Sequence, residues 1–311
     1  MTIAAAAAEP HVVPADRLAA LPRYGVGVLY NAALPSFLRE SWDALDYLAI
    51  IPDRFWTDEG EGRPGRYTPV EAPIDILDRV AQHLPIVGHS VGLSIGSAEL
   101  FDTEHVRQIA QWQQRYRMAW HSDHLSFLRV KGQDAHSQLA GLPIPVPYDH
   151  EVLDLLAERV ERVQREIPVP FLLENNVYYV EIPDQEMTEP EFLNRLMHRT
   201  GCGLLLDIHN VHCNATNHGF SAREFIHDID LTRVVEVHIA GGSEMAGMYT
   251  DSHAGAVAGP VWDLLDDVVA HAPNLCAITF EFDESYFPTL QSEGVRAELK
   301  HARAIWDRHH A

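Results

Sequence analysis

GLLLDIHNVH, residues 203–212, sets the pattern from which the fold is predicted. A run of leucines gives way abruptly to a carboxylate and then to imidazole and amide side chains. A short apolar run of this kind is typical of a strand buried on both faces of a parallel sheet. Similar runs recur, separated by amphipathic stretches of helix length, which indicates repeated βα units. We predict eight strands, over Tyr24–Tyr30, Asp46–Ile51, Pro85–Val91, Met118–His121, Val169–Glu174, Gly203–Asp207, Val234–Ala240 and Ala277–Glu281.

The stretches between the strands carry signals for helices. Thr188 with Glu191 and Ser221 with Glu224 match the S/T-x-x-E capping box, which satisfies free backbone amides where a helix begins. Apolar residues recur at helical spacing between Tyr148 and Ile167, giving one stripe that can pack against a sheet.

The whole pattern predicts an α/β fold, a single (β/α)₈ TIM-type barrel over residues 1–311 with a closing helix at Ser292–His309. Residues 1–22 are expected to be a loosely ordered N-terminal extension. Two longer connections rich in proline and glycine, Thr57–Pro73 and Val130–Pro147, are expected to pass over the barrel mouth.

Composition narrows the class of partner. The chain has 23 Lys plus Arg against 45 Asp plus Glu, a formal charge of -22, which disfavours binding to a phosphate backbone. The three cysteines form no closely spaced framework, so a disulfide-stapled fold is not expected. No export signal is evident, and no stretch approaches the roughly 18 to 20 apolar residues of a membrane span. We therefore expect a cytoplasmic protein that binds neither nucleic acid nor membrane.

Ionisable side chains gather at the C-terminal ends of the predicted strands. In a (β/α)₈ barrel these ends meet at one face, where active sites are built. We therefore predict a metal site at that face. The residues that would form it come from six strands and one loop: His89, His124, Glu174, Asp207, His238, Glu281, and, from the loop, Asp251 and His253.

The carboxylates in this set are the reason to expect a metal. Glu174, Asp207 and Glu281 each follow an apolar run directly, where burial without a counter-charge is costly. Lys and Arg are absent from these motifs, so bound cations are the simplest neutralisation. Nitrogen and oxygen ligands without thiolate suit iron, manganese or zinc, and several carboxylates suit a polynuclear site.

Each residue also has a simpler interpretation. Taken singly, any of the predicted ligands can be an ion-pair partner or a strand-end cap. His121, His209 and His212 can be hydrogen-bonding neighbours of the ligands. Asparagines after a strand are commonly turn formers. We predict hydrogen bonds to the ligands, without direct ligation, for Asp123, Asn175, His209 and Asn210, and no role for the helical histidines His83, His105, His198, His227, His271, His309 and His310.

Several motifs together resemble the multinuclear non-heme iron-dependent oxidase (MNIO) family, from about Tyr24 to the C-terminus. They are GVGVLYN at 25–31, VGHSVGLSIG at 87–96, SDHLSF at 122–127, LLENN at 172–176, CGLLLDIHNVHCNATNHGF at 202–220, VEVHIAGG at 235–242, DSH at 251–253, PVWDLLDDVV at 260–269 and ITFEFDE at 278–284. The long element around Asp207 is the most specific of these.

The resemblance implies a set of ligands for two or three iron ions, mixed Fe(II) and Fe(III). One ion would be held by His89, His124 and Glu174. A second would take Glu174, Asp207, His238 and Glu281, and a third Asp207, Asp251 and His253. The family uses O₂ as cosubstrate to modify residues, often cysteine, of ribosomally made precursor peptides, usually with a small partner protein that presents the peptide. No protein side chain is predicted to be the hydrogen-abstracting group.

Two departures from the family pattern bear on the substrate. The second predicted strand runs into DYLAIIPDRFW, with Asp53 and Arg54 where the family commonly has a Glu-containing strand ending near a P-E-N-like turn. DIHN places His209 where the family commonly has Asn, and ENNVYY replaces an ENVSSY-like sequence. Both changes are compatible with a different peptide target.

Two other classes of protein share these residues. Xylose-isomerase-like barrels, including sugar isomerases and zinc-dependent abasic-site endonucleases, also bind metal ions through His, Asp and Glu. A non-catalytic scaffold that binds metal and peptide is the third alternative. The acidic charge of the chain weakens the nuclease version.

Overall fold

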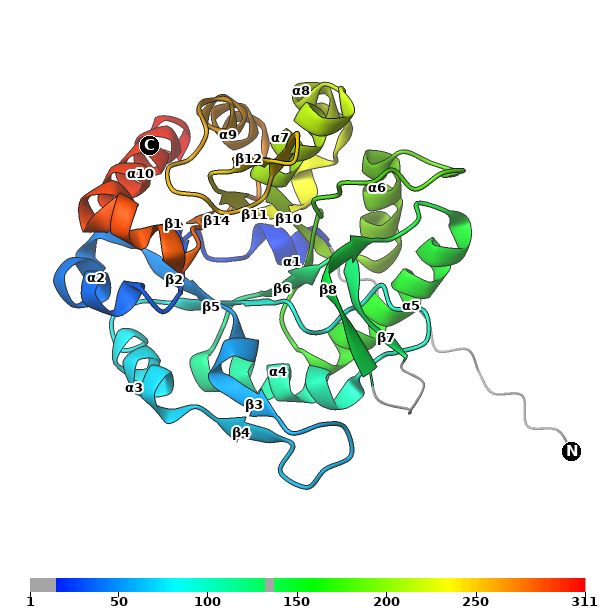
Figure 1. Ribbon diagram of the computed structural model, residues 1–311, viewed down its shortest axis with the longest axis horizontal. Helices are drawn as coiled ribbons and strands as arrows, with labels where there is room; N and C mark the ends of the chain where they lie inside the picture. Colours follow the sequence, from blue (N-terminus) through cyan, green and yellow to red (C-terminus); the bar gives the residue numbers. More distant parts are fainter. Residues whose placement is uncertain (1–14, 132–136, 311) are drawn as a thin grey trace, which may run out of the picture.

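The computed structural model describes residues 15–131 and 137–310, and its centre is a closed barrel of parallel strands. The strand order around the barrel is β1-β14-β11-β10-β9-β6-β5-β2. Helices surround the strands on the outside (Figure 1). The predicted TIM-type barrel is confirmed. The barrel strands are β1 (Gly25–Leu29), β2 (Tyr47–Ile50), β5 (Ile86–Ser90), β6 (His121–His124), β9 (Phe171–Glu174), β10 (Gly203–Asp207), β11 (Val234–Ile239) and β14 (Ala277–Phe280).

One predicted strand is misplaced. Residues 118–121 were expected to form the fourth strand, but β6 begins at His121 and runs to His124. The preceding helix α4 ends at Tyr116, its capping residue Arg117 has φ 51°, and the Met118 amide donates back to the carbonyl of Gln113. Met118 therefore still belongs to the helix end, and the polar residues His121 to His124 form the strand itself instead of following it.

The helices begin and end where local signals predict. Thr188 and Ser221 accept hydrogen bonds from the Glu191 and Glu224 amides, so both predicted N-terminal caps are confirmed. The helices are α2 (Leu34–Ser41), α3 (Glu71–Val80), α4 (Thr103–Tyr116), α5 (His150–Glu166), α6 (Glu189–Thr200), α7 (Ile208–His218), α8 (Ala222–Asp228), α9 (Gly259–His271) and α10 (Phe287–His310), with short 3₁₀ turns η1 (Trp42–Ala44), η2 (Pro52–Phe55), η3 (Leu231–Arg233) and η4 (Glu284–Tyr286). The closing helix starts earlier than expected because α10 continues across a kink at Gln291.

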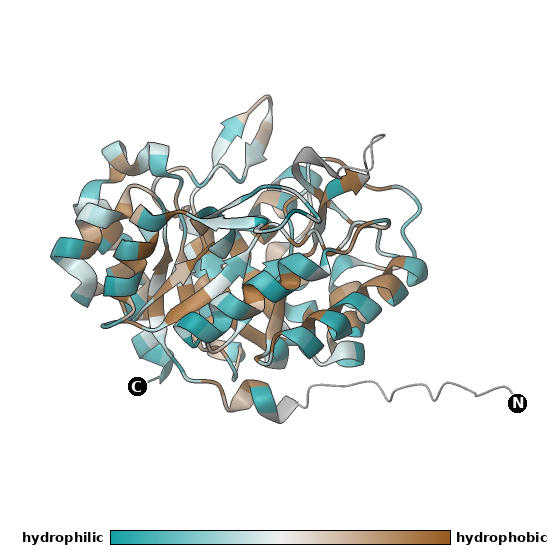
Figure 2. Ribbon diagram, turned by 90° about the horizontal axis from the view of Figure 1, so that it is seen from below, coloured by the Kyte–Doolittle hydropathy of each residue, from teal (hydrophilic) through white to brown (hydrophobic). Residues whose placement is uncertain are grey.

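Apolar side chains fill both surfaces of the barrel wall. Figure 2 shows hydrophobic residues along the strands and hydrophilic residues over much of the outer helix surface. Inside the barrel, Tyr47 and Trp120 are fully buried among small and branched residues such as Val87 and Leu205. A larger cluster lies between the strands and the helices. The barrel interior is therefore packed with apolar side chains, and the polar side chains inside the barrel lie at its C-terminal end, where a site can form.

A short helix, α1 (Ala15–Ala19), lies beneath the barrel in Figure 2. Its Leu18 is buried against the interior cluster. Of the extension expected to be loosely ordered, residues 1–14 lie outside the described residues, and residues 15–19 are helical.

Three hairpins interrupt the βα pattern. They are β3 (Trp56–Asp58) with β4 (Tyr67–Pro69), β7 (Ser126–Lys131) with β8 (Ser137–Pro145), and β12 (Ser243–Met245) with β13 (Met248–Thr250). The expectation that residues 57–73 cover the mouth is wrong: β3 and β4 lie beside α4 at the rim (Figure 1), where Arg66 pairs with Asp58 and Asp102. Of the expected segment 130–147, strand β8 lines the opening with Pro143, while residues 132–136 lie outside the described residues.

Candidate metal centre

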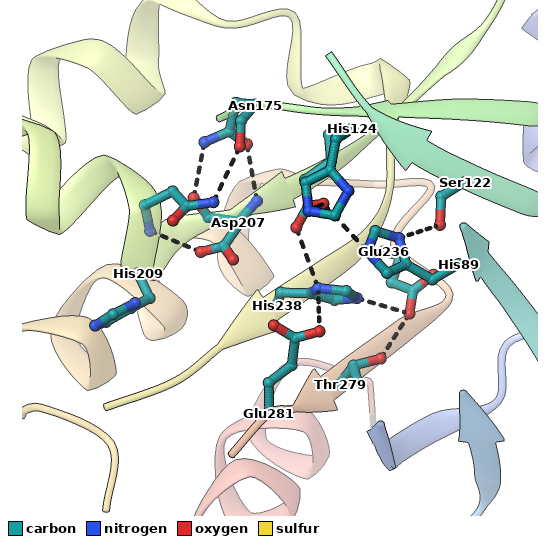
Figure 3. Close-up of polar contacts among 12 residues, drawn as sticks. His89, Ser122, His124, Asn175, Asp207, His209, Glu236, His238, Thr279 and Glu281 are labelled. Carbon is teal, nitrogen blue, oxygen red and sulfur yellow. Dashed lines mark hydrogen bonds and ion pairs between the residues drawn. The ribbon is translucent and has the colours of Figure 1, made fainter. Parts of the chain in front are cut away.

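The C-terminal end of the barrel holds a pocket of about 180 Å³. Every predicted ligand except His238 lines it, and His238 lies fully buried beneath. Figure 3 shows the deeper side chains pointing toward one another from different strands. Residues far apart in sequence therefore meet at one face, as the topology predicts.

His89, His124 and Glu174 form the first group. Glu174 Oε2 lies 3.4 Å from His89 Nε2 and 3.1 Å from His124 Nε2. Strand register brings this about, because His124 and Glu174 are direct neighbours on β6 and β9. His89 Nδ1 lies 3.0 Å from the Ser122 hydroxyl, which donates to the Gly88 carbonyl. The hydrogen bond to Ser122 leaves Nε2 of His89 as the nitrogen that faces the group.

His238 connects this group to the other carboxylates. Its Nδ1 lies 3.3 Å from Glu174 Oε1 and 3.0 Å from Glu281 Oε1. Asp207 is paired with His238 across β10 and β11, so its carboxylate stands beside the same imidazole. All four side chains are nearly or completely buried.

Asp251 and His253 approach from the loop after β13. His253 Nε2 lies 3.0 Å from Asp251 Oδ1 and 3.4 Å from Glu281 Oε2. His253 has φ 49°, and its carbonyl accepts from the Asp283 amide. The loop packs closely against Gly241, whose carbonyl accepts a hydrogen bond from the Ala254 amide. A Cβ at this position would clash with the backbone oxygen of Ala256, so the close approach requires glycine.

Amide and imidazole groups form hydrogen bonds with the backbone and carboxylate of Asp207 and with the carboxylate of Asp251. Asn175 donates to the Asp207 carbonyl and accepts from its amide, at 2.9 and 2.8 Å. The Asn210 amide donates to Asp207 Oδ1 at 2.7 Å, as the cap of α7. His209 Nδ1 lies 3.0 Å from Asp251 Oδ1.

Asp123 is the exception among the four predicted neighbours of the ligands. It is buried, its carboxylate oxygens have no hydrogen-bond partner among the described residues, and no contact to a predicted ligand's side chain is evident there. Burial, with the nearby Asp53 charge, raises the pKa of Asp123 well above its ordinary value. The other histidines, His121 and His212, lie outside the compact groups, and His105 pairs with Asp53.

Glu236 is a residue that sequence reasoning missed. It is completely buried and accepts hydrogen bonds from Trp120 Nε1 at 2.7 Å, Thr279 Oγ1 at 2.6 Å and His238 Nε2 at 3.3 Å. The hydrogen bond from Nε2 leaves Nδ1 of His238 free to face Glu174 and Glu281. Figure 3 shows His238 between Glu236 and Glu281. A carboxylate behind a ligating histidine is the usual device that fixes the ring and its tautomer in a metal site.

Regular alternation places Glu236 inside the barrel, on the same face as His238 two residues further along β11. A β-bulge lies just before it, where β10 pairs Leu204 with Val234 but Leu205 with Glu236. The spacing of two residues from the predicted ligand His238 is the sequence signal that could have found Glu236. Arg54, an exposed residue of η2, also lines the pocket, although the ligand motifs contain no cation.

Burial and like charge shift pKa values in the same direction at this site, and opposite charge counteracts burial. Burial and the neighbouring Glu174 charge raise the pKa of Asp207 well above its ordinary value. Burial lowers the pKa of His89 well below its ordinary value. For His253 the effect of burial is outweighed by Asp251 and Glu281, which raise its pKa to about 10. Without a bound cation, the negative charge of these buried carboxylates can be neutralised only by protons, on the carboxylates or on the neighbouring histidines.

The imidazole and carboxylate groups of this site lie close together but do not satisfy one another's hydrogen-bonding capacity, an arrangement that suits a bound metal ion. Glu174 Oε2 and His238 Nδ1 are buried without a hydrogen-bond partner among the described residues, although other donors and acceptors lie within 3.0 to 3.4 Å. Three overlapping groups bring their ligand atoms within 4.8 Å of one another: His89, His238 and Glu281; His89, His124 and Glu174; and Glu174, Asp207 and His238. Nitrogen and carboxylate donors of this kind suit a transition metal, and the shared residues suit neighbouring ions. Neither Asp251 nor His253 belongs to these compact groups.

Solved structures with the same fold include several enzymes and a zinc-binding barrel. Endonuclease IV from Thermus thermophilus is 16 % identical with a TM-score of 0.55, covering 92 % of this chain and 100 % of that one. D-psicose 3-epimerase from Clostridium cellulolyticum H10 is 10 % identical with a TM-score of 0.58, covering 91 % and 99 %. The IOLI protein, solved with a zinc atom, is 13 % identical with a TM-score of 0.54, covering 92 % and 99 %. Fold and site together define a TIM barrel with His, Asp and Glu side chains at its open end that could hold a metal ion.

Sequence comparison gives the family. The family model described as RiPP precursor modification enzyme MbnB/TglH/ChrH matches residues 24–307. A UPF0276 protein of Caulobacter vibrioides (strain NA1000 / CB15N) is 31 % identical, covering 87 % of this chain and 90 % of the relative. The UPF0276 protein RB0508 of Rhizobium meliloti (strain 1021) is 34 % identical, covering 85 % and 84 %. The chain belongs to the MbnB/TglH/ChrH family of enzymes that modify RiPP precursors, which confirms the resemblance to the MNIO family.

A search of the described residues for helices able to span a membrane finds none.

Proposed function

We propose that this protein is a cytosolic, O₂-dependent oxidase that uses two or three iron ions, Fe(II) and Fe(III), to modify a residue of a ribosomally made precursor peptide. The residue modified is a cysteine, and a small partner protein presents the peptide. Family membership supports a precursor peptide as substrate. The observation that carries the metal part is the set of buried imidazole and carboxylate donors that converge without satisfying one another.

The proposed ligands would form up to three metal positions. His89, His124 and Glu174 would hold one ion, and Glu174, Asp207, His238 and Glu281 a second, with Glu174 shared. Asp251 and His253 would complete a third position with Asp207. When bound, iron supplies a Lewis acid for a thiolate and a centre for O₂ chemistry.

The chain's own residues set the geometry for that chemistry. Asn175 holds the backbone of Asp207, the backbone amide of Asn210 holds its carboxylate, and Glu236 fixes the His238 ring. The apolar interior of the barrel excludes water from below the site, because Trp120 and Tyr47 close the space under Glu236. The substrate would therefore enter only from the open end, past Pro143 and Arg54.

Anaerobic reconstitution tests the proposal. Protein loaded with Fe(II) is exposed to O₂ together with the co-encoded peptide and its partner protein, and the peptide mass is followed. We expect a mass change that depends on O₂ and on the peptide cysteine, with a Cys-to-Ser peptide as the matched control. An unchanged peptide mass with fully loaded, partially oxidised iron would contradict the oxidase function.

The similar barrels favour a second candidate, a divalent-metal sugar isomerase or zinc-dependent endonuclease. Stoichiometric zinc after aerobic purification, with activity on sugar or DNA, would support it. For the third candidate, a scaffold without catalysis, iron binding would persist without O₂ consumption.

A further inference from the structure

A second pocket, of about 280 Å³, lies between the end of β8, the loop after β9 and the start of α6. Glu189 lines it and is 6 % exposed. Its carboxylate lies beside the Tyr148 hydroxyl, and neither oxygen has another donor among the described residues. A buried carboxylate with so few donors is uncommon in a folded protein and leaves room for a further polar partner.

The position of Glu189 in α6 does not explain this arrangement. Glu189 is the first residue of the helix, where a negative charge is favourable. The helix amide at Glu191 is already capped by Thr188, however, so the carboxylate is not needed there. Burial raises the pKa of Glu189 to about 8, against a smaller opposing effect of the Tyr148 hydroxyl. A positive group in the pocket would relieve the cost of ionising it.

Two tyrosines form further walls of the pocket. Tyr148 packs against Phe192, with ring centroids 5.2 Å apart, and Tyr178 stacks on His218 at 4.7 Å. Each ring is therefore held by a neighbour before any ligand arrives. Aromatic faces beside a carboxylate attract ammonium and guanidinium groups. Glu181 adds a second acidic group, which is 76 % exposed at its side chain.

The pocket also lies close to the candidate metal centre. Pro143 lines the metal pocket and Pro145 lines this one, and both belong to β8. Two residues of extended chain span roughly 7 Å. A peptide lying along β8 would therefore pass both pockets within a few residues.

We propose that the pocket of Glu189, Tyr148 and Tyr178 binds a lysine or arginine side chain of the substrate peptide, a few residues from the one that is modified. The inference rests on the proposed function in one respect, that the substrate is a peptide. The acidic balance of the whole chain, -22, agrees with a basic partner.

A matched pair of peptides, one charged and one uncharged, tests the pocket without iron chemistry. The probes are acetyl-Gly-Lys-Gly-amide and its norleucine counterpart, titrated by NMR into the full-length protein. We expect the lysine peptide to bind at least fivefold more tightly. Glu189→Gln should remove this preference, while Glu244→Gln, which changes an exposed carboxylate outside the pocket, should alter it less than twofold. Equal binding of the two probes, or a preference unchanged in Glu189→Gln, would overturn the proposal.

A second variant and a kinetic readout keep the test decisive. Should Glu189→Gln fold poorly, Tyr178→Leu is expected to weaken lysine-peptide binding at least threefold, and unchanged binding would count against the pocket. In the oxidase assay, replacing the basic residues of the peptide with norleucine should raise KM at least fivefold and leave kcat nearly unchanged. An unaltered KM would overturn the role of the pocket while the oxidase function stands. Selective lysine binding with no peptide modification at all would leave the pocket standing and defeat the oxidase.

Discussion

At the scale of single residues, Glu236 determines how His238 meets a metal. Glu236→Gln keeps the size of the side chain but replaces the charged acceptor for Trp120, Thr279 and His238. We expect iron affinity to fall roughly 10- to 100-fold, as for other carboxylates behind ligating histidines. Iron retained per protein after competition with a chelator measures this. The exposed Glu244→Gln is the control, and equal retention in both variants would show that Glu236 plays no such part.

Glu189 gives a prediction about pH. Its pKa is raised from 4.5 to about 8, so the folded protein keeps a proton that the unfolded chain releases between these values. Its contribution to stability is therefore complete below about pH 4.5 and is lost as pH rises toward 8, by at most roughly 1.4 kcal/mol per pH unit. Thermal unfolding of Glu189→Gln should show a weaker fall in Tm across this window than the parent protein. Parallel Tm curves would contradict the burial argument, and Glu181→Gln serves as the exposed control.

At the scale of elements, the βα pattern predicted most of the fold because each strand is a compact apolar run. The pattern misplaced the start of the fourth strand. The Met118 amide donates a hydrogen bond back to Gln113 of α4, so Met118 belongs to the end of the helix and not to the strand. The candidate ligands could be predicted because the C-terminal ends of the barrel strands must meet. Glu236 lies two residues before His238 on the same strand, so its inward face was predictable, but its hydrogen bonds from Trp120 and Thr279 are revealed only by the fold. The pocket at Glu189 also escaped prediction, since it forms between a hairpin, a loop and a helix.

The caps of the helices are a further test at this scale. Ser221 accepts from the Glu224 amide at the start of α8. Ser221→Ala should lower the free energy of unfolding by about 1 kcal/mol, because one backbone amide loses its acceptor. Ser221→Thr should retain most of that stability. Chemical denaturation compares the three proteins, and an unchanged midpoint for Ser221→Ala would show that the cap contributes nothing.

At the scale of the whole molecule, several buried carboxylates lie together at the C-terminal end of the barrel, and a bound cation would stabilise this arrangement. Removing the metal should therefore lower Tm by several degrees, since a ligand at 100 times its Kd contributes about 2.7 kcal/mol. Differential scanning fluorimetry with and without iron measures the shift. Glu281→Gln, which removes one of the converging charges, should show a smaller shift. The same Tm for loaded and metal-free parent protein would be inconsistent with a metal held by these groups.

The central claim is that side chains from separate strands hold neighbouring iron ions at the open end of the barrel. Anomalous diffraction at the iron absorption edge, from crystals of anaerobically iron-loaded protein, tests it most directly. We predict at least two peaks, one bounded by His89, His124 and Glu174 and one by Glu174, Asp207 and His238. Peaks confined to other parts of the molecule, or none from protein whose iron content is stoichiometric, would contradict the account.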